Sequence, residues 1–239
     1  DLATPAIYDR GAYYYTRGMA GRWGQGGGTA NVTAFKKFFP DLKPKRILDL
    51  GCAIGWTTLP IVDEWPDAEV HALDLGESFM RYAHARAEAL GKTVHYHQMS
   101  GENLKFPDGH FDLVFSGGLF HETSNKAAKV IMKEIHRVLK SGGVSFNFDI
   151  PYGGDYKLHA QFMLNWDCYF NAEPFWREWT SWDRREFMSW GGFDKDTVID
   201  TWAARDHEGN FRFFEKPFDE LHTSARGGIG RVQFFGAQK

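Results

Sequence analysis

One stretch near the middle of the first half constrains the fold of this chain more than any other. Residues 47–55 read Ile-Leu-Asp-Leu-Gly-Cys-Ala-Ile-Gly, an apolar run that ends in the carboxylate of Asp49 and continues into closely spaced small residues. Glycine lets a backbone turn sharply and approach a ligand closely, and the start of a following helix presents N–H groups and partial positive charge. Such a loop at the carboxyl end of a parallel strand typically binds a nucleotide. The stretch therefore predicts a strand, a binding loop and a helix.

The spacing within this motif narrows the kind of nucleotide. Dinucleotide-binding loops read G-x-G-x-x-G and phosphate-binding loops end in Gly-Lys-Ser/Thr, whereas this loop reads Asp49-x-Gly51-x-Ala53-x-Gly55. It resembles motif I (D/E-x-G-x-G-x-G) of the class I S-adenosylmethionine (SAM)-dependent methyltransferases, with Ala53 at the middle glycine. The resemblance implies that these four residues and Cys52 contribute to a SAM site. An ordinary strand-to-helix turn is the alternative interpretation.

A second carboxylate supports the nucleotide interpretation. Residues 70–74 read as a strand ending in Asp74, about 25 residues after Asp49. Rossmann-like folds place a ribose-binding acid at a similar offset, because one carboxylate matches the two hydroxyl donors of a vicinal diol. The alternative is a surface acid that caps the next helix. The family resemblance adds Leu75 to the cofactor site and places Phe79 over the adenine, although Phe79 is equally expected in the core.

Residues 100–115 resemble the next conserved block of the family, G-D-A-E-x-L-P-F-P-D-x-x-F-D-x-V. The resemblance assigns Ser100, Gly101 and Glu102 to the adenine end of the cofactor. Ser100 stands where the family has an aspartate, and a serine hydroxyl offers only one short bond. Further on, residues 139–144 resemble the L-K-P-G-G block and residues 191–193 the A-G-F turn. The resemblance is close over residues 45–150 and loose over 190–239.

The loop after the fourth predicted strand, residues 117–122, indicates the type of acceptor. It reads Gly-Gly-Leu-Phe-His-Glu and lacks the Asn/Asp-Pro-Pro-Tyr/Phe of enzymes that methylate amino groups in nucleic acids and protein amides. It resembles the small-molecule methyltransferases with ubiquinone- and menaquinone-methyltransferase-like motifs, and Gly117 is assigned to the cofactor. Imidazole titrates near ~6.5, so His121 is the first candidate for a base, with His159 second. Either histidine can instead be a hydrogen-bonded residue of a packed loop.

Two regions outside the core motifs carry open alternatives. Residues 1–30 are rich in Tyr and Gly, which predicts little regular structure and either a lid hinged at glycines 26–28 or a packed leader. Residues 151–190 are dense in aromatic side chains and predict either a substrate cap or a helical subdomain with an aromatic core. Within them, Thr180 with Asp183 is predicted to start a helix. His95 and His97 share one side of a strand, where a half-exposed face is expected rather than a zinc pair.

Composition bounds the remaining possibilities. The chain has 239 residues, 43% of them hydrophobic, and a net charge of -3, which provides no electrostatic footprint for nucleic acid. No apolar run approaches the ~20 residues that span a bilayer, and no signal peptide is recognised. Two cysteines suit a reducing compartment. The sequence begins with Asp1 rather than Met, so a trimmed N-terminus is expected. We therefore expect a cytoplasmic protein with a small-molecule acceptor and no nucleic-acid or membrane partner; its oligomeric state is open.

Together these features predict one α/β domain over residues 1–239, with a Rossmann-like, mostly parallel, seven-stranded sheet. Its predicted parts are an N-terminal lid and helix (1–44), a SAM-binding core (45–150), a substrate cap (151–190) and closing strands (191–239). The expected reaction is methyl transfer from SAM to a small aromatic or hydrophobic acceptor, giving S-adenosylhomocysteine, with O-methylation assisted by a histidine base. The alternatives are N- or C-methylation by proximity, or a SAM-binding scaffold without catalysis. No metal is expected, because no Asp…Asp-Asn set follows the fourth strand, and activity is expected to survive a chelator.

Overall fold

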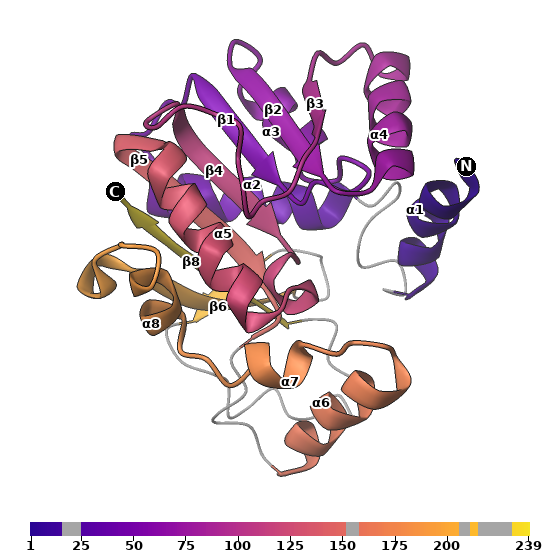
Figure 1. Cartoon of the computed structure of the whole chain (residues 1–239), viewed down its shortest axis with the longest axis vertical. Coiled ribbons are helices and arrows are strands. Elements are labelled where there is room, and N and C mark those ends of the chain that lie inside the picture. The colour runs from indigo at the N-terminus through magenta and orange to yellow at the C-terminus, as the bar shows by residue number, and fades with distance from the viewer. Residues whose placement is uncertain (16–24, 152–157, 206–210, 215–230) are drawn as a thin grey trace.

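Eight strands of the described residues form one mixed sheet (Figure 1). The computed structural model describes residues 1–15, 25–151, 158–205, 211–214 and 231–239. The strand order is β3-β2-β1-β4-β5-β8-β6-β7; β1 to β5 pair in parallel, and β8, β6 and β7 continue the sheet antiparallel. The strands are β1 Arg46–Leu50, β2 Glu69–Asp74, β3 His95–Gln98, β4 Phe111–Gly117, β5 Leu139–Asp149, β6 Ile199–Arg205, β7 Phe211–Phe214 and β8 Arg231–Gln238.

The α/β class and the mostly parallel sheet are confirmed, but the predicted count of seven strands is wrong. The additional strand is β7. No strand was predicted there because the surrounding segment is rich in polar residues and glycine. Its Phe213 packs against Phe234 of β8 and against Phe38. Aromatic residues favour a pleated, half-buried surface, so these contacts hold a short edge strand in place.

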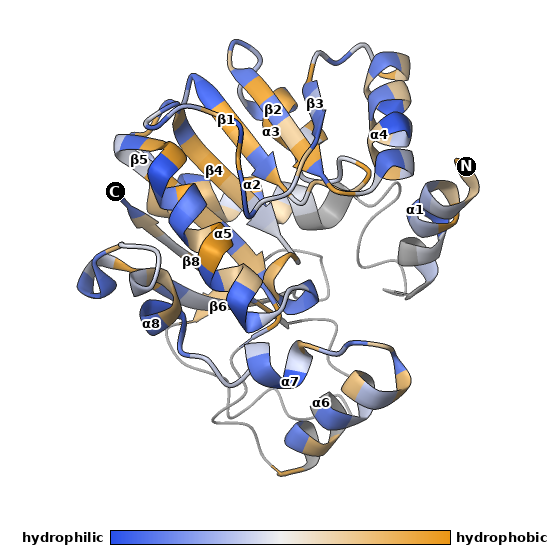
Figure 2. Ribbon diagram, in the orientation of Figure 1, coloured by the Kyte–Doolittle hydropathy of each residue, from blue (hydrophilic) through white to orange (hydrophobic). Residues whose placement is uncertain are grey.

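Both faces of the sheet are covered by helices, which explains why the central strands are apolar along their length (Figure 2). Ile47 packs in the core formed with Phe35, whereas its neighbour Leu48 packs on the opposite face with Ile131. The helices of the first face are α2 (Gln25–Phe38), α3 (Thr58–Glu64) and α4 (Glu77–Ala89), and those of the second are α5 (Asn125–Val138) and α8 (Arg184–Ser189).

The N-terminal region is more regular than its composition predicts. Residues Ala3–Tyr15 form helix α1, and α2 already begins at Gln25, so glycines 26–28 lie inside a helix rather than in a hinge. A Cβ on Gly28 would lie 2.2 Å from the carbonyl oxygen of Trp56, so α2 depends on this glycine to approach the cofactor loop. The prediction of little regular structure is therefore wrong for α1 and for the start of α2, and residues 16–24 lie outside the described residues.

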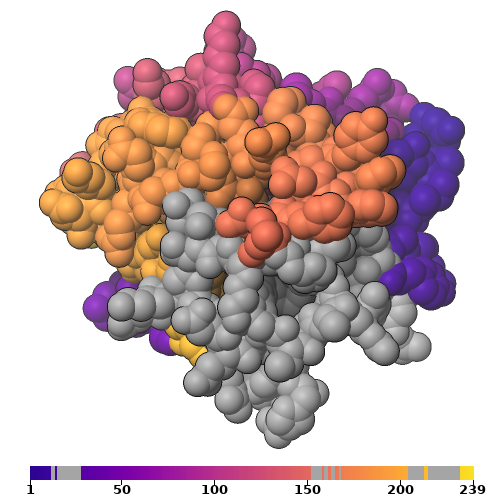
Figure 3. Space-filling model, turned by 90° about the horizontal axis from the view of Figure 1, so that it is seen from below, coloured from indigo at the N-terminus to yellow at the C-terminus, as the bar shows by residue number. Residues whose placement is uncertain are grey.

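The insertion after β5 is helical, with exposed and buried aromatic residues in different parts. Its helices include α6 (Leu158–Phe170) and α7 (Trp176–Trp179). The insertion and α1 are both visible on the side of the molecule that Figure 3 shows. Helix α6 exposes Phe162 and Tyr169, whereas Trp179 and Phe187 are buried in the core. The predicted helix start at Thr180 is wrong: the N-cap of α8 is Asp183, whose carboxylate accepts a hydrogen bond from the backbone of Glu186.

Two single-turn helices complete the described part of the chain, η2 (Phe120–Glu122) and η3 (Lys195–Thr197). The predicted half-exposed face of β3 is confirmed, since His95 is exposed and His97 is partly buried. Both rings stack against His71 of β2. Among the described helices, none combines the length and the apolar character needed to cross a membrane.

Candidate functional site

The loop after β1 has the backbone geometry that its glycines were predicted to provide. Gly51, Ala53 and Gly55 all adopt left-handed conformations, with φ of 73°, 46° and 85°. The N–H groups of Gly51 and Cys52 both donate to the carbonyl of Leu73 at 2.9 Å, which ties the loop to the end of β2. An alanine in this conformation costs roughly 1–2 kcal/mol, so the surrounding contacts hold Ala53 in a strained position.

Asp74 lies at the carboxyl end of β2 and is anchored by two backbone amides. Its Oδ2 accepts from the N–H of Ala53 at 3.0 Å, and its Oδ1 accepts from the N–H of Gly76 at 2.9 Å. The second bond shapes the turn into α4 but does not cap it, since the N-cap is Gly76 and has no side-chain cap hydrogen bond. A carboxylate has about four acceptor positions, so an anchored and partly exposed Asp74 retains capacity for a diol.

The other residues assigned to the adenine end gather near Asp74. Leu75 follows it directly with 67% of its surface exposed, and Phe79 is partly buried in the first turn of α4. The hydroxyl of Ser100 accepts from the N–H of Glu102 at 3.2 Å and thereby shapes the loop after β3. Gly101 packs closely against the side chains of the core, where an added Cβ would lie 3.3 Å from Leu50.

Asp49 lies beneath the loop rather than on its surface. It is 1% exposed, and its carboxylate accepts a hydrogen bond from the hydroxyl of Thr58 at 2.5 Å. Burial raises its pKa, the Thr58 hydrogen bond lowers it and the charge of Asp74 raises it, and the net pKa is about 7. Asp49 thus stabilises the loop after β1 through its hydrogen bond to Thr58 at the start of α3.

Asp74 and Leu75 fit an adenosyl group, and Gly51 and Gly117 are required by the packing around them. A Cβ at Gly51 would lie 2.9 Å from the Leu119 side chain, and one at Gly117 would lie 2.3 Å from the ring of Phe148, so both positions admit only glycine without a shift of their neighbours. The loop thereby keeps its close turns, and the anchored carboxylate of Asp74 stands beside an exposed apolar residue. A diol acceptor next to an apolar surface is what a ribose and its base require.

The second half of the site is built around His121 of η2. Its Nδ1 lies 2.6 Å from Oδ1 of Asp149, the last residue of β5, whose side chain is fully buried. The same carboxylate accepts from the backbone N–H groups of Phe120 at 2.9 Å and Ile150 at 2.7 Å. Asp149 therefore fixes the orientation of the imidazole. Sequence reasoning missed this partner, although a carboxylate at the end of the fifth strand was a usable signal.

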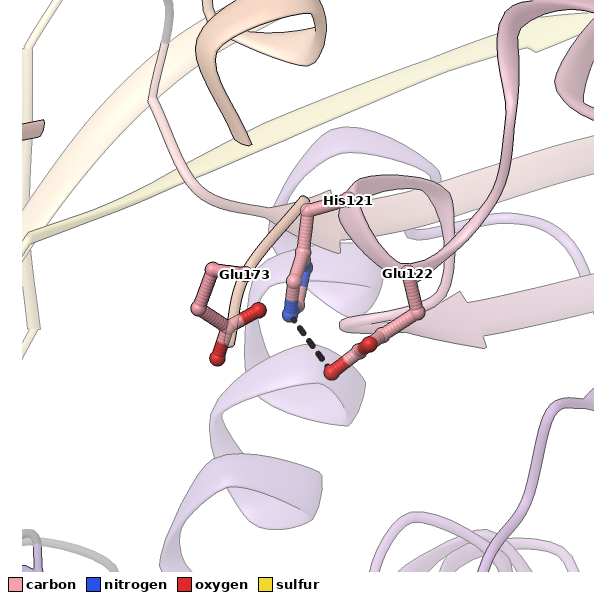
Figure 4. Close-up of side chains that lie close together, drawn as sticks. All are labelled: His121, Glu122 and Glu173. Carbon is pink, nitrogen blue, oxygen red and sulfur yellow. Dashed lines mark ion pairs between the residues drawn. The ribbon is translucent and has the colours of Figure 1, made fainter. Parts of the chain in front are cut away.

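Two glutamates face the other nitrogen of His121 (Figure 4). Nε2 lies 3.5 Å from Oε1 of Glu122, and Glu173 reaches the same place from the insertion between α6 and α7. Burial lowers the pKa of His121, but the charge and hydrogen bond of Asp149 and the Glu122 carboxylate outweigh it and raise the pKa to about 10. Sequence reasoning also missed Glu173, which lies far from His121 in the chain.

Helix α1 connects the two halves. The ring of Tyr8 stacks on Trp56 at 5.1 Å and meets Phe79 edge-on at 5.6 Å. Burial raises the pKa of the Tyr8 hydroxyl, and the carboxylates of Glu122, Asp74 and Glu173 raise it further. The Tyr8 hydroxyl therefore feels the charges of both halves. The second candidate base, His159, belongs to α6, and its side chain lies outside what the structure describes.

Comparison with known proteins agrees with this geometry. Residues 47–143 match a family model described as a methyltransferase domain. Demethylmenaquinone methyltransferase of Thermus thermophilus is 34% identical over 127 residues, which cover 51% of this chain and 57% of that protein. Ajmaline N-methyltransferase of Rauvolfia serpentina is 30% identical over 105 residues, covering 43% of this chain and 35% of that protein. The chain thus spans about half the length, or less, of these curated relatives.

Solved structures share the fold over most of the chain. A SAM-dependent methyltransferase from Aquifex aeolicus aligns with a TM-score of 0.57 at 17% identity, covering 99% of this chain and 97% of that one. Phosphoethanolamine N-methyltransferase 2 of Haemonchus contortus, solved with SAM, aligns with a TM-score of 0.59 at 17% identity, covering 87% of this chain and 52% of that one. Residues 47–143 are therefore similar to a methyltransferase domain, and the whole chain shares the fold of a solved SAM-dependent methyltransferase.

Proposed function

We propose that this chain transfers the methyl group of SAM to the hydroxyl of a small aromatic or hydrophobic acceptor. The observation that carries the proposal is the oriented pair of His121 and Asp149 at the same sheet edge as the anchored Asp74. Carboxyl ends of adjacent parallel strands meet at one edge, which is where ligands bind in such sheets. A polar group for the acceptor thus stands beside the residues that fit the cofactor.

The chain contributes mainly binding and orientation. The loop of Gly51 to Gly55 and the carboxylate of Asp74 would hold the adenosyl part of SAM, which supplies when bound a methyl group activated by a sulfonium. Aligning a nucleophile with such a group can lower a barrier by ~7–11 kcal/mol. Helix α1, held against Trp56 by Tyr8, would exclude water from the same space.

His121 would assist by accepting the acceptor proton at Nε2. Asp149 holds the ring by Nδ1 and stabilises the imidazolium that forms, as a buried carboxylate does in other proton relays. The pKa of about 10 is close to that of a phenol, which is ≈ 10, so transfer of a proton from an aromatic hydroxyl would be nearly balanced. The neutral imidazole becomes scarcer as the pH falls below this value, so the rate should increase with pH.

Methylation of an amine is the second candidate, and the charges around His121 favour it. The carboxylates of Glu122 and Glu173 form an acidic environment that suits a cationic acceptor. Nitrogen can attack by proximity once it is unprotonated, so the rate would depend less on a base. Near-full activity of His121→Ala on an amine would move the assignment to this candidate.

The cofactor assignment is tested by titration calorimetry with SAM and with S-adenosylhomocysteine. Asp74→Ala should weaken both by tenfold or more, since a hydrogen-bonded charged group contributes about 1.5–3 kcal/mol. Asp67→Ala is the matched control, because Asp67 is exposed and precedes β2 at the opposite end of the strand. Absence of binding by the folded wild-type chain would overturn the proposal.

The acceptor is tested with a panel of phenols, aliphatic alcohols and amines, using wild type and His121→Ala. Turnover of a hydroxyl acceptor that falls at least about a hundredfold in the variant supports a role of His121 in ionising the hydroxyl. Tight SAM binding with no turnover of any panel member would instead indicate a SAM-binding scaffold.

A further inference from the structure

The side chains around Nε2 of His121 have the composition of a metal site. One imidazole nitrogen and one oxygen from each of Glu122 and Glu173 lie within 4.8 Å of one another, and Figure 4 shows the two carboxylates converging on the ring. Ligands bound at about 2.0–2.2 Å to a common ion stand roughly 3–4.4 Å apart. Only a small inward movement of the two flexible glutamate side chains separates the present arrangement from coordination.

His121 is already oriented as a ligand. Metal-binding histidines usually direct their other ring nitrogen to a carboxylate, which sets the tautomer and strengthens the ligand. Asp149 occupies this position at 2.6 Å from Nδ1, is fully buried, and is itself held by two backbone amides. With Nδ1 committed to Asp149, Nε2 is the nitrogen left to face Glu122 and Glu173.

The charge balance also favours a cation. Three carboxylates, those of Asp149, Glu122 and Glu173, lie around a single imidazole, which makes the cluster acidic. The cluster is partly enclosed, since the His121 side chain is 14% exposed and the ring of Trp176 lies edge-on at 5.7 Å. The Glu122 side chain is 57% exposed, which provides a route of entry from solvent.

We propose that His121, Glu122 and Glu173 bind one divalent transition-metal cation, and that this cation holds and ionises the acceptor hydroxyl. Imidazole is a common ligand of zinc and iron, and carboxylate is a common ligand of manganese. A set of one imidazole nitrogen and two carboxylate oxygens therefore suits these transition metals better than it suits calcium or magnesium. Three protein ligands leave coordination positions open for an acceptor. The proposal rests on the methyl transfer to a hydroxyl proposed above, assigns the ionisation of that hydroxyl to the cation in place of His121, and replaces the expectation from sequence that the site holds no metal.

The cation would take over the role assigned above to Nε2, because a ligating nitrogen cannot also accept a proton. A hydroxyl bound to a divalent cation ionises near neutral pH. Its proton leaves to solvent, the acceptor oxygen forms a bond to the methyl carbon, and the electron pair of the broken carbon–sulfur bond stays on sulfur. The buried indole N–H of Trp176, which makes no hydrogen bond among the described residues, offers a donor in the same cluster.

The test is direct metal binding by the full chain. Protein stripped with EDTA is titrated with Zn²⁺ and with Mn²⁺, following heat and, for manganese, the paramagnetic resonance signal of the free ion. One equivalent is expected to bind to wild type. Glu173→Gln should weaken binding by at least about tenfold, whereas Glu178→Gln, at an exposed position of α7 in the same insertion, should leave it unchanged.

Titration of the same samples with SAM separates this proposal from the proposed function. Normal SAM binding by a wild-type chain that binds neither cation overturns the metal site alone, as does equal cation binding by Glu173→Gln. Absence of SAM binding overturns the proposed function instead. If Glu173→Gln fails to fold, Glu122→Gln replaces it, because Glu122 lies largely in solvent and its loss should weaken the cation equally.

Discussion

At the residue scale, two buried aspartates at strand ends of one sheet have different environments and different uses. Asp149 accepts two backbone N–H groups and faces an imidazole. Asp49 has the Thr58 hydroxyl as its hydrogen-bond partner and lies in the field of Asp74. The same residue type therefore orients a histidine in one place and carries an electrostatic cost in the other.

The prediction at this scale concerns the pH dependence of stability. Burial raises the pKa of Asp49 to about 7 in the folded chain, above its ordinary value of ≈ 3.9 when unfolded. The folded state holds the proton more tightly, so this group's contribution is fully present below pH ~4 and is lost as the pH rises to ~7. The loss amounts to about 4 kcal/mol at most, at ~1.4 kcal/mol per unit.

Asp49→Asn should remove that loss. Denaturant unfolding at several pH values should show the variant gaining stability relative to wild type between pH 5 and 7.5, because Asn keeps an acceptor for Thr58 without a charge. Asp67→Asn, at an exposed position, should run parallel to wild type. Parallel curves for Asp49→Asn as well would show that the carboxylate is ionised at little cost.

At the scale of elements, helix α1 is docked by one buried carboxylate. Asp9 is 5% exposed, accepts a hydrogen bond from the hydroxyl of Tyr82 at 2.8 Å and from the indole of Trp56 at 3.4 Å, and lies 3.9 Å from Arg86. Its neighbour Tyr8 stacks on the same indole. Since Trp56 directly follows the cofactor loop, the position of α1 and the shape of that loop are coupled.

Asp9→Asn should loosen α1 without unfolding the core. Loss of the charge in these hydrogen bonds should cost about 1.5–3 kcal/mol, which corresponds to roughly 10- to 150-fold faster amide exchange in residues 3–15. Hydrogen exchange with mass spectrometry measures this directly, and Asp41→Asn, at an exposed site, is the control. Exchange in α1 that stays at the wild-type rate would show that aromatic stacking alone docks the helix.

At the scale of the whole molecule, a buried arginine joins the insertion to the sheet. Arg184 is 0% exposed, and its guanidinium lies 3.7 Å from the centre of the Trp179 ring. It donates to the carbonyl of Ile150 at 2.9 Å, next to Asp149, and to the side chain of Gln233 on β8 at 3.1 Å. The chain that leaves β5, the insertion and the antiparallel strands therefore share one hydrogen-bonding centre.

Replacing this centre should destabilise the whole domain. Arg184→Met fills a similar volume but leaves buried carbonyls without their donor, and removing one partner of such a network costs about 3–5 kcal/mol. At roughly 2–4 °C per kcal/mol for a chain of this size, Tm should fall by about 6–20 °C. Arg185→Met, one residue along on the exposed side of α8, should shift Tm by about 2 °C or less. Equal Tm values for both variants would contradict a central role for Arg184.

Local chemistry explains which features could be predicted from sequence. The strand, loop and helix at residues 46–64 depend on neighbouring residues, because left-handed turns require glycine or a tolerated alanine and buried parallel strands require apolar runs. The Asp74 position follows from the same local pattern. Helix α1 and strand β7 were not predicted, because their stability comes from partners elsewhere, such as Asp9 with Tyr82 and Phe213 with Phe234.

The sequence by itself determined that this chain builds a mostly parallel α/β sheet with a SAM-type loop, since that loop and its strand lie within one short stretch. Only the tertiary structure decided which side chains gather around His121. Asp149 meets His121 because β4 and β5 pair side by side, and Glu173 reaches Nε2 because the insertion packs back on η2. These contacts depend on strand order and on how an insertion packs, which periodicity and spacing along a chain do not encode.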